Sequence, residues 1–253
     1  MIYDLQKASL LKRASAWLLD VILLVVLACG FGMVMSSVLD YDAQSETLFG
    51  YYEKYEKQYG VDFDATAEEL EKMTQEQKDR FNAASEALLK DPEVLQAYNM
   101  VVSMSLVILS ASVLLSYLCM EFAVPLLLKN GQTIGKKIFG IALMRADGVR
   151  LTPFMLFVRT VLGKYTIETM IPLMAMAMLL LGTMGGVALT VLLVLVVCEV
   201  VLMIRSKTNS TIHDYMSATV AVDLSSQMIF DTPEDLMAYR KQVHAEHVKK
   251  ETY

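Results

Sequence analysis

The sequence predicts an all-α polytopic membrane protein with four transmembrane helices, a helical extracytoplasmic insertion and an amphipathic cytoplasmic segment. Of its 253 residues, 55% are hydrophobic, and they are concentrated in long blocks, as is typical of membrane proteins. The blocks reach or exceed the roughly 20 residues that cross a bilayer. Acidic and basic segments alternate between the blocks, and this alternation predicts the orientation of the chain.

We expect the four helices at residues 14–39, 98–128, 166–182 and 186–204. Asp91 and Pro92 form a favourable cap and first helical position, so the second helix is expected to begin at Pro92. The apolar stretch 166–204 is too long for one span, and the glycines between 182 and 186 divide it. One long tilted or kinked helix is the alternative for this stretch.

Charge predicts which segments lie inside the cell. Residues 40–97 hold fifteen acidic and six basic residues, whereas residues 129–164 hold seven basic residues and one acidic residue. Lysine and arginine near helix ends favour the cytoplasmic side. We therefore expect both termini and the segment 129–164 in the cytoplasm and the insertion 40–97 outside, which four helices satisfy and three do not.

Local signals predict structure inside the insertion and the tail. Thr66 to Glu69 match a capping box, and an apolar stripe of helical spacing follows it. Tyrosines between 51 and 59 indicate a second helix upstream. The insertion is thus expected to form a helical cap that binds a partner or, more simply, joins two long helices. Residues 1–222 form the expected membrane domain, and the tail 223–253 forms a polar helix from Pro233.

The segment 129–164 mixes apolar and basic residues as an interfacial element does. Asp147 and Gly148 predict a turn between residues 141–144 and 149–151, and hence a short hairpin. Thr152 and Pro153 predict the start of a short helix, 154–163, along the inner surface.

No motif for catalysis or metal binding stands out. Gly131 to Lys136 is one residue too short between its glycines for a phosphate loop. Ser210, His213 and Asp214 are too close in sequence on one helix to form a hydrolase triad. The three cysteines show no disulfide or metal spacing and are expected to be small core residues. We expect no enzymatic activity, no cofactor and no metal.

Ionisable residues inside the apolar blocks carry the sharper signal. Each predicted helix has one acidic residue about 6–12 Å from its cytoplasmic end, and six bases lie just below this layer: the acids are Asp20, Glu121, Glu168 and Glu199, and the bases are Arg13, Lys136, Lys137, Arg159, Lys164 and Arg205. Pro125 is expected to loosen the second helix and free the carbonyl of Glu121. Either the carboxylates pair with the bases and hold the bundle together, or some line a hydrated cavity and bind a cation or proton.

The ordered set of polar motifs resembles the RDD family of bacterial integral membrane proteins. It comprises Arg13-x2-Ala16-x3-Asp20, Gly131-x-Thr133-x-Gly135-Lys136, Asp147-Gly148, Arg159 and His213-Asp214-x4-Thr219. The family is named for an arginine and two aspartates, which correspond to Arg13, Asp20 and Asp214. Ala218 stands where the family commonly has glycine.

The resemblance implies a multi-pass protein of the bacterial plasma membrane. A transport role, including cation/proton exchange, is proposed for such proteins, and it makes Asp20 and Glu121 the candidate proton or cation carboxylates. Arg13 and Asp214 would form an inner-face pair, supported by Lys136, Arg159, Arg205 and His213. The expected partners are the lipid bilayer, a second copy or another membrane protein, and no nucleic acid. The alternative function is an accessory protein that stabilises or regulates a membrane complex through its outer cap or its tail.

Overall fold

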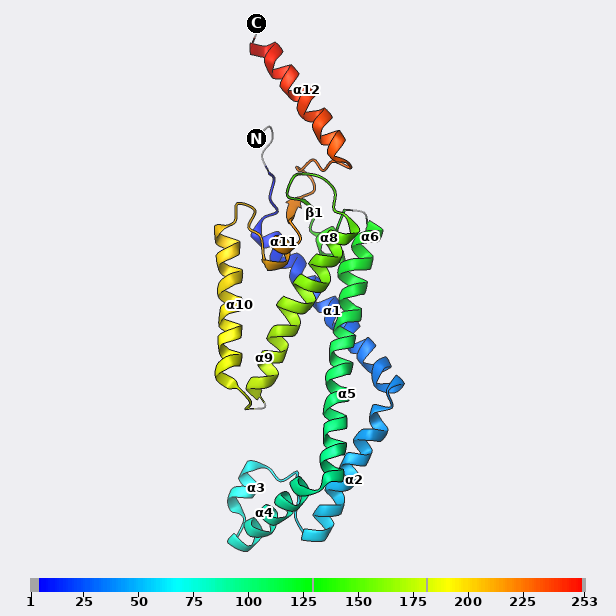
Figure 1. Ribbon diagram of the computed structural model, residues 1–253, viewed down its shortest axis with the longest axis vertical. Coiled ribbons are helices and arrows are strands. Elements are labelled where there is room, and N and C mark those ends of the chain that lie inside the picture. The colour runs from blue at the N-terminus through cyan, green and yellow to red at the C-terminus, as the bar shows by residue number, and fades with distance from the viewer. Residues whose placement is uncertain (1–4, 129, 181, 252–253) are drawn as a thin grey trace. The chain divides into compact units, whose positions relative to one another are not determined.

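The structure is a computed structural model that describes residues 5–128, 130–180 and 182–251. The chain divides into two compact units, one of residues 1–28 and 113–253 and the other of residues 29–112. We call them the membrane-network unit and the insertion unit and describe each by itself. Helices dominate both units (Figure 1).

The insertion unit contains the end of α1 (Leu10–Val38), then α2 (Tyr41–Tyr59), α3 (Ala67–Lys72), α4 (Gln75–Lys90) and most of α5 (Pro92–Tyr117). Thr66 caps α3 with the expected capping box, and Thr74 caps α4 with a second one. The core contains Leu48, Leu88 and Val94, against which the tyrosines of α2 pack. The predicted helices of this segment, including the aromatic-rich one upstream, are thus present.

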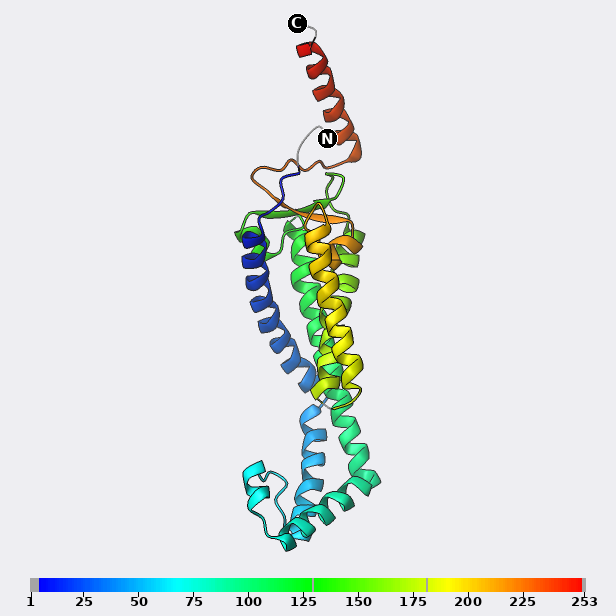
Figure 2. The same ribbon diagram turned by 90° about the vertical axis from the view of Figure 1, so that its left-hand side faces the viewer.

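The membrane-network unit begins with the first part of α1 and resumes at the end of α5. It continues through the π-helix η1 (Leu118–Ala123), α6 (Val124–Leu128), α7 (Ile134–Ile138), β1 (Ile141–Arg145), α8 (Pro153–Phe157), the π-helix η2 (Val158–Met170), α9 (Ile171–Leu180) and α10 (Gly185–Arg205). It ends with α11 (Ile212–Met216), β2 (Thr219–Asp223) and α12 (Pro233–Glu251), the helix expected for the tail. The helices α9 and α10 run side by side (Figures 1 and 2).

Three helices among the described residues are long and apolar enough to cross a membrane: Leu10–Val38, Pro92–Leu128 and Gly185–Arg205. Their exposed side chains are large and apolar, such as Val26 on α1 and Val196 on α10, and suit lipid contact. The expected fourth span, 166–182, is not among these three, so the count of four is not confirmed. Cys29, Cys119 and Cys198 are exposed, so their expected place in the core was wrong.

The prediction of a separate inner helix at 154–163 was also wrong, because the chain remains helical from Pro153 to Leu180. Thr152 caps the start as expected, with its hydroxyl accepting from the backbone N–H of Met155. The helix does not end at Gly163 but passes through it as a π-helix. Pro172 follows this π-helix by two residues, just as Pro125 follows η1. Proline donates no backbone hydrogen bond, and each of these prolines lies four residues after a glutamate, Glu168 or Glu121.

A two-stranded antiparallel sheet joins distant parts of the membrane-network unit. β1 pairs with β2 in a register from Ile141 opposite Asp223 to Arg145 opposite Thr219. Its two faces pack into two separate clusters, one with Ala8 and Ala16 and the other with Leu5 and Ile229. The predicted turn at 146–148 is present, but residues 149–150 supply only one isolated bridge to β1. The main partner of β1 is therefore a strand 74 residues further on, which the hairpin prediction missed.

Candidate functional site

The beginning of α7 binds the carboxylate of Asp20, which is 5% exposed. Thr133 donates its hydroxyl to Oδ2 at 2.5 Å, and the backbone N–H of Gly135 donates to Oδ1 at 2.8 Å. A Cβ on Gly135 would collide with the backbone oxygen of Ala16 and with the Asp20 carboxyl. Only glycine at position 135 therefore allows α1 and α7 to approach this closely.

Lys136 lies between two buried carboxylates from different helices. Its Nζ is 3.7 Å from Oδ2 of Asp20 and 3.5 Å from Oε2 of Glu121. Lys164 forms a shorter ion pair with Oε1 of Glu121. The carbonyl of Glu121 accepts the Thr160 hydroxyl at 2.9 Å, as expected for an acceptor released by Pro125. Two carboxylates and two ammonium groups thus form a compact group of zero net charge.

Asp214 is the centre of a second group and is 1% exposed. Nη1 of Arg159 pairs with its Oδ1, and Nη2 of Arg13 lies 3.0 Å from its Oδ2. Burial works to raise the pKa of Asp214, but Arg159, His213 and Arg13 together hold this pKa well below its usual range. Asp214 is therefore an ionised anchor for two arginines.

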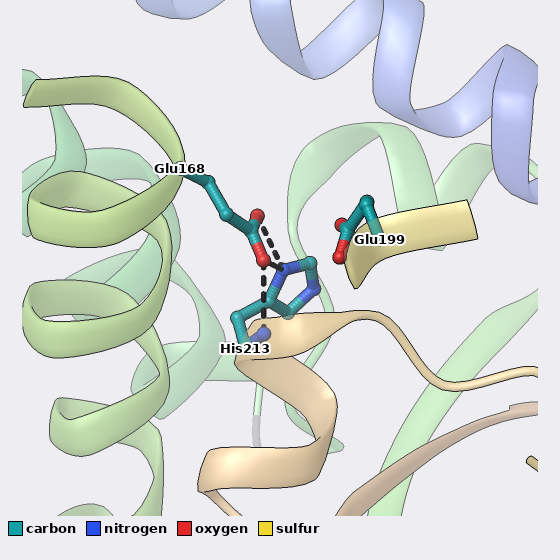
Figure 3. A group of neighbouring side chains, drawn as sticks. All are labelled: Glu168, Glu199 and His213. Atoms are coloured by element: carbon teal, nitrogen blue, oxygen red, sulfur yellow. Dashed lines mark hydrogen bonds and ion pairs between the residues drawn. The ribbon is translucent and has the colours of Figure 1, made fainter. Parts of the chain in front are cut away.

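His213 lies in a third group with Glu168 of η2 and Glu199 of α10 (Figure 3). Nδ1 of His213 is 2.6 Å from Oε2 of Glu168, and the backbone N–H of His213 donates to Oε1 at 2.9 Å. The backbone N–H of Ile212 donates to Oε2 of Glu199 at 2.9 Å. Burial and Arg159 lower the pKa of His213.

These three groups surround a cavity of about 370 Å³. Its wall is apolar around Trp17, Ile141 and Met203. The ionisable side chains on its wall are Arg13, Asp20, Lys136, Arg159, Lys164 and His213. A cavity of this size that combines apolar walls with convergent polar groups is typical of a small-molecule site.

The structure brings most of the predicted site residues together but groups them differently. Asp214 pairs with Arg13 and Arg159, whereas Arg205 is exposed at the end of α10 and takes part in no ion pair with another described residue. The single layer of four carboxylates divides into two pairs, Asp20 with Glu121 and Glu168 with Glu199. Sequence reasoning missed the hydroxyls that bind these groups, and the threonine in the motif after Gly131 was the one available signal.

Lys136 makes the first group sensitive to pH. Burial lowers the pKa of Lys136 to about 8, although Glu121 and Asp20 oppose this shift. Because an exposed lysine titrates near 10.5, unfolding takes up a proton between pH 8 and 10.5, and folding is favoured as pH rises through this window. We expect the melting temperature of the wild type to rise relative to that of Lys136→Met between pH 8 and 10.5. Thermal unfolding in detergent across this range measures the difference, and a constant difference would contradict the assignment.

One comparison with known proteins covers all the residues of these three groups. Searches of curated proteins and of solved structures found no match. The model of the RDD family matches residues 7–218, which include every residue of the three groups. Arg13, Asp20 and Asp214, the arginine and aspartates expected from the family's name, are all buried or half-buried in these groups. The chain belongs to the RDD family, a conclusion that covers most of its length.

Proposed function

We propose that this protein exchanges a monovalent cation for a proton across the membrane, with Asp20 and Glu121 as the cation-binding carboxylates. The observation that supports this is the position of Lys136, whose ammonium lies between the two carboxylates and which lines the cavity together with Asp20. The ammonium group of Lys136 is itself a monovalent cation, and the two carboxylates bind it as they would bind an inorganic ion. The site in the structure therefore has the charge and the oxygen ligands that an inorganic cation requires.

Loss of one proton from Lys136 changes the charge of the group. With both lysines protonated, Asp20, Glu121, Lys136 and Lys164 sum to zero, and the neutral Lys136 amine leaves one uncompensated negative charge. One monovalent cation restores neutrality, so one proton is exchanged for one cation. The low pKa of Lys136, about 8, makes this release accessible under mild conditions, which is the property expected of a proton carrier.

The proposal includes four transmembrane spans with both termini in the cytoplasm of a bacterium. The helical run Pro153–Leu180 supplies the fourth span next to α10. Its charged residues Arg159, Lys164 and Glu168 are paired with other groups, which reduces the cost of placing them at membrane depth. The basic residues of 129–164 support the orientation.

Flux through liposomes tests the exchange. Wild-type protein should dissipate an imposed pH gradient when sodium or potassium is added. Asp20→Asn and Glu121→Gln should each slow it about tenfold or more, because a charged hydrogen-bonded ligand contributes about 1.5–3 kcal/mol. Fluorescence of an entrapped pH indicator measures the rate.

A matched control is Asp223→Asn, which removes a carboxylate from the partly exposed pair with Lys12 in the same unit. It should leave the rate unchanged. Absent flux in the wild type, or equal flux in all three variants, would overturn the exchange. Each variant is first shown to remain monodisperse and folded, so that loss of flux reports the site.

The structure of the insertion unit supports one alternative function, the binding of another protein. It has its own buried core and an acidic surface, as a module that binds another membrane protein would have. In this alternative, the protein is an accessory that stabilises or regulates a membrane complex. It predicts no flux in liposomes even for the folded wild type, so the same assay separates the two functions.

A further inference from the structure

His213 and two glutamates form a set of metal-ligating side chains outside the proposed exchange site. The imidazole projects between the carboxylates of Glu168 and Glu199 (Figure 3). One ligand atom from each residue lies within 4.8 Å of the other two. The three residues come from η2, α10 and α11, so the chain converges on this point from three separate segments.

The charges around this group differ from those around every other buried carboxylate described above. Asp20, Glu121 and Asp214 each lie within 4 Å of a lysine or arginine nitrogen. In the described part of the chain, no lysine or arginine pairs with Glu168 or Glu199, whose partners are His213 and backbone N–H groups. Two neighbouring carboxylates without a lysine or arginine partner among the described residues leave negative charge that a cation would balance.

Surrounding contacts hold the three ligands in place. The backbone N–H groups of Ile212 and His213 each orient one carboxylate. Gly163 of η2 lies against His213, where an added Cβ would come within 2.6 Å of the His213 Cβ. Such contacts outside the ligands fix ligand geometry in metal sites. His213 also lines the cavity, which provides a path for an ion.

We propose that Glu168, Glu199 and His213 bind a divalent transition-metal ion of the zinc type. The donor set of two carboxylate oxygens and one imidazole nitrogen favours such ions over Mg²⁺ or Ca²⁺, which prefer oxygen ligands alone. The bound ion replaces the hydrogen bond between the ring and Glu168 and ties α11 to two membrane helices. Three protein ligands leave further coordination positions for water or a solute. The site does not depend on the proposed cation exchange, because Asp20, Glu121 and Lys136 take no part in it.

The experiment uses the full chain, purified in detergent, freed of any affinity tag and stripped with chelator. Isothermal titration with Zn²⁺ should show one ion bound per chain, and Mg²⁺ should not compete. Glu168→Gln and Glu199→Gln should each weaken Zn²⁺ binding at least about tenfold. Asp223→Asn, which removes a carboxylate of the same unit outside the three ligands, should bind Zn²⁺ as the wild type does. Stoichiometry below one in the wild type, or equal affinity in all variants, would overturn the site.

A second measurement leaves the three ligands intact. The chain has three histidines, so His213 is the only one that remains in the double variant His244→Asn, His247→Asn. Pulsed electron paramagnetic resonance of bound Cu²⁺ in this variant should show the nitrogen modulation of one imidazole. Absence of that modulation would contradict the proposal even if the glutamate variants fail to fold.

Discussion

Replacing Asp214 with asparagine is expected to destabilise the protein by about 3–5 kcal/mol, the usual cost of removing one member of a buried ion pair. Arg159 is only 2% exposed, and its guanidinium would lose its one carboxylate partner. Arg13 would lose its ion pair as well. Thermal unfolding in detergent, monitored by intrinsic fluorescence, measures the loss.

The control for this variant is again Asp223→Asn. Its partner Lys12 is 44% exposed at the side chain, so water replaces the lost pair and the expected change stays within about 1 kcal/mol. The double variant Asp214→Asn, Arg159→Met should recover part of the stability, because the buried guanidinium of Arg159 is no longer left without a carboxylate. Equal melting temperatures for Asp214→Asn and Asp223→Asn would show that Asp214 is not an anchor.

Gly163→Ala is expected to cost about 1–3 kcal/mol through overpacking. The new methyl group would lie 2.6 Å from Cβ and 2.8 Å from Cα of His213. Since the second of these atoms is backbone, α11 as a whole must move away from η2. Thermal unfolding measures the loss, and weaker Zn²⁺ binding should accompany it because His213 moves with α11.

Gly186→Ala provides the comparison, since a Cβ there meets nothing within 4 Å and alanine favours a helix more than glycine does. It should leave the melting temperature unchanged or raise it. A Gly163→Ala protein as stable as Gly186→Ala would mean that α11 is not held against η2 as described.

Local signals predicted the beginnings of helices well. Pro92, Pro153 and Pro233 each occupy the first helical position, because proline at that position loses no hydrogen bond. The partner of β1 could not be predicted in this way. Its pairing with β2 depends on a contact across 74 residues, while the nearer turn at Asp147 and Gly148 offered a local alternative.

For the candidate site, too, the local signals could be predicted from the sequence but the long-range contacts could not. The buried acids and bases were visible as charges in apolar blocks, but their pairing depends on where α1, η1, η2 and α10 meet the short helices α7 and α11. The expectation of no metal rested on sequence spacing, whereas Glu168, Glu199 and His213 are brought together only by the fold. Ala218, at a position where the family resemblance leads one to expect glycine, has a φ of 50°, in the left-handed region that favours glycine.

The separation in sequence of the ion pairs has a consequence for biosynthesis. Arg13 reaches its partner across 201 residues, and Asp20 reaches Thr133 across 113. At about 5–20 residues per second, the ribosome makes Asp214 roughly 10–40 s after Arg13. Until α7 has been made, the first helix must reside in the translocation machinery or the bilayer with both charges unmatched. A nascent chain that stops short of α7 therefore leaves both Arg13 and Asp20 without the partners that they have in the finished protein.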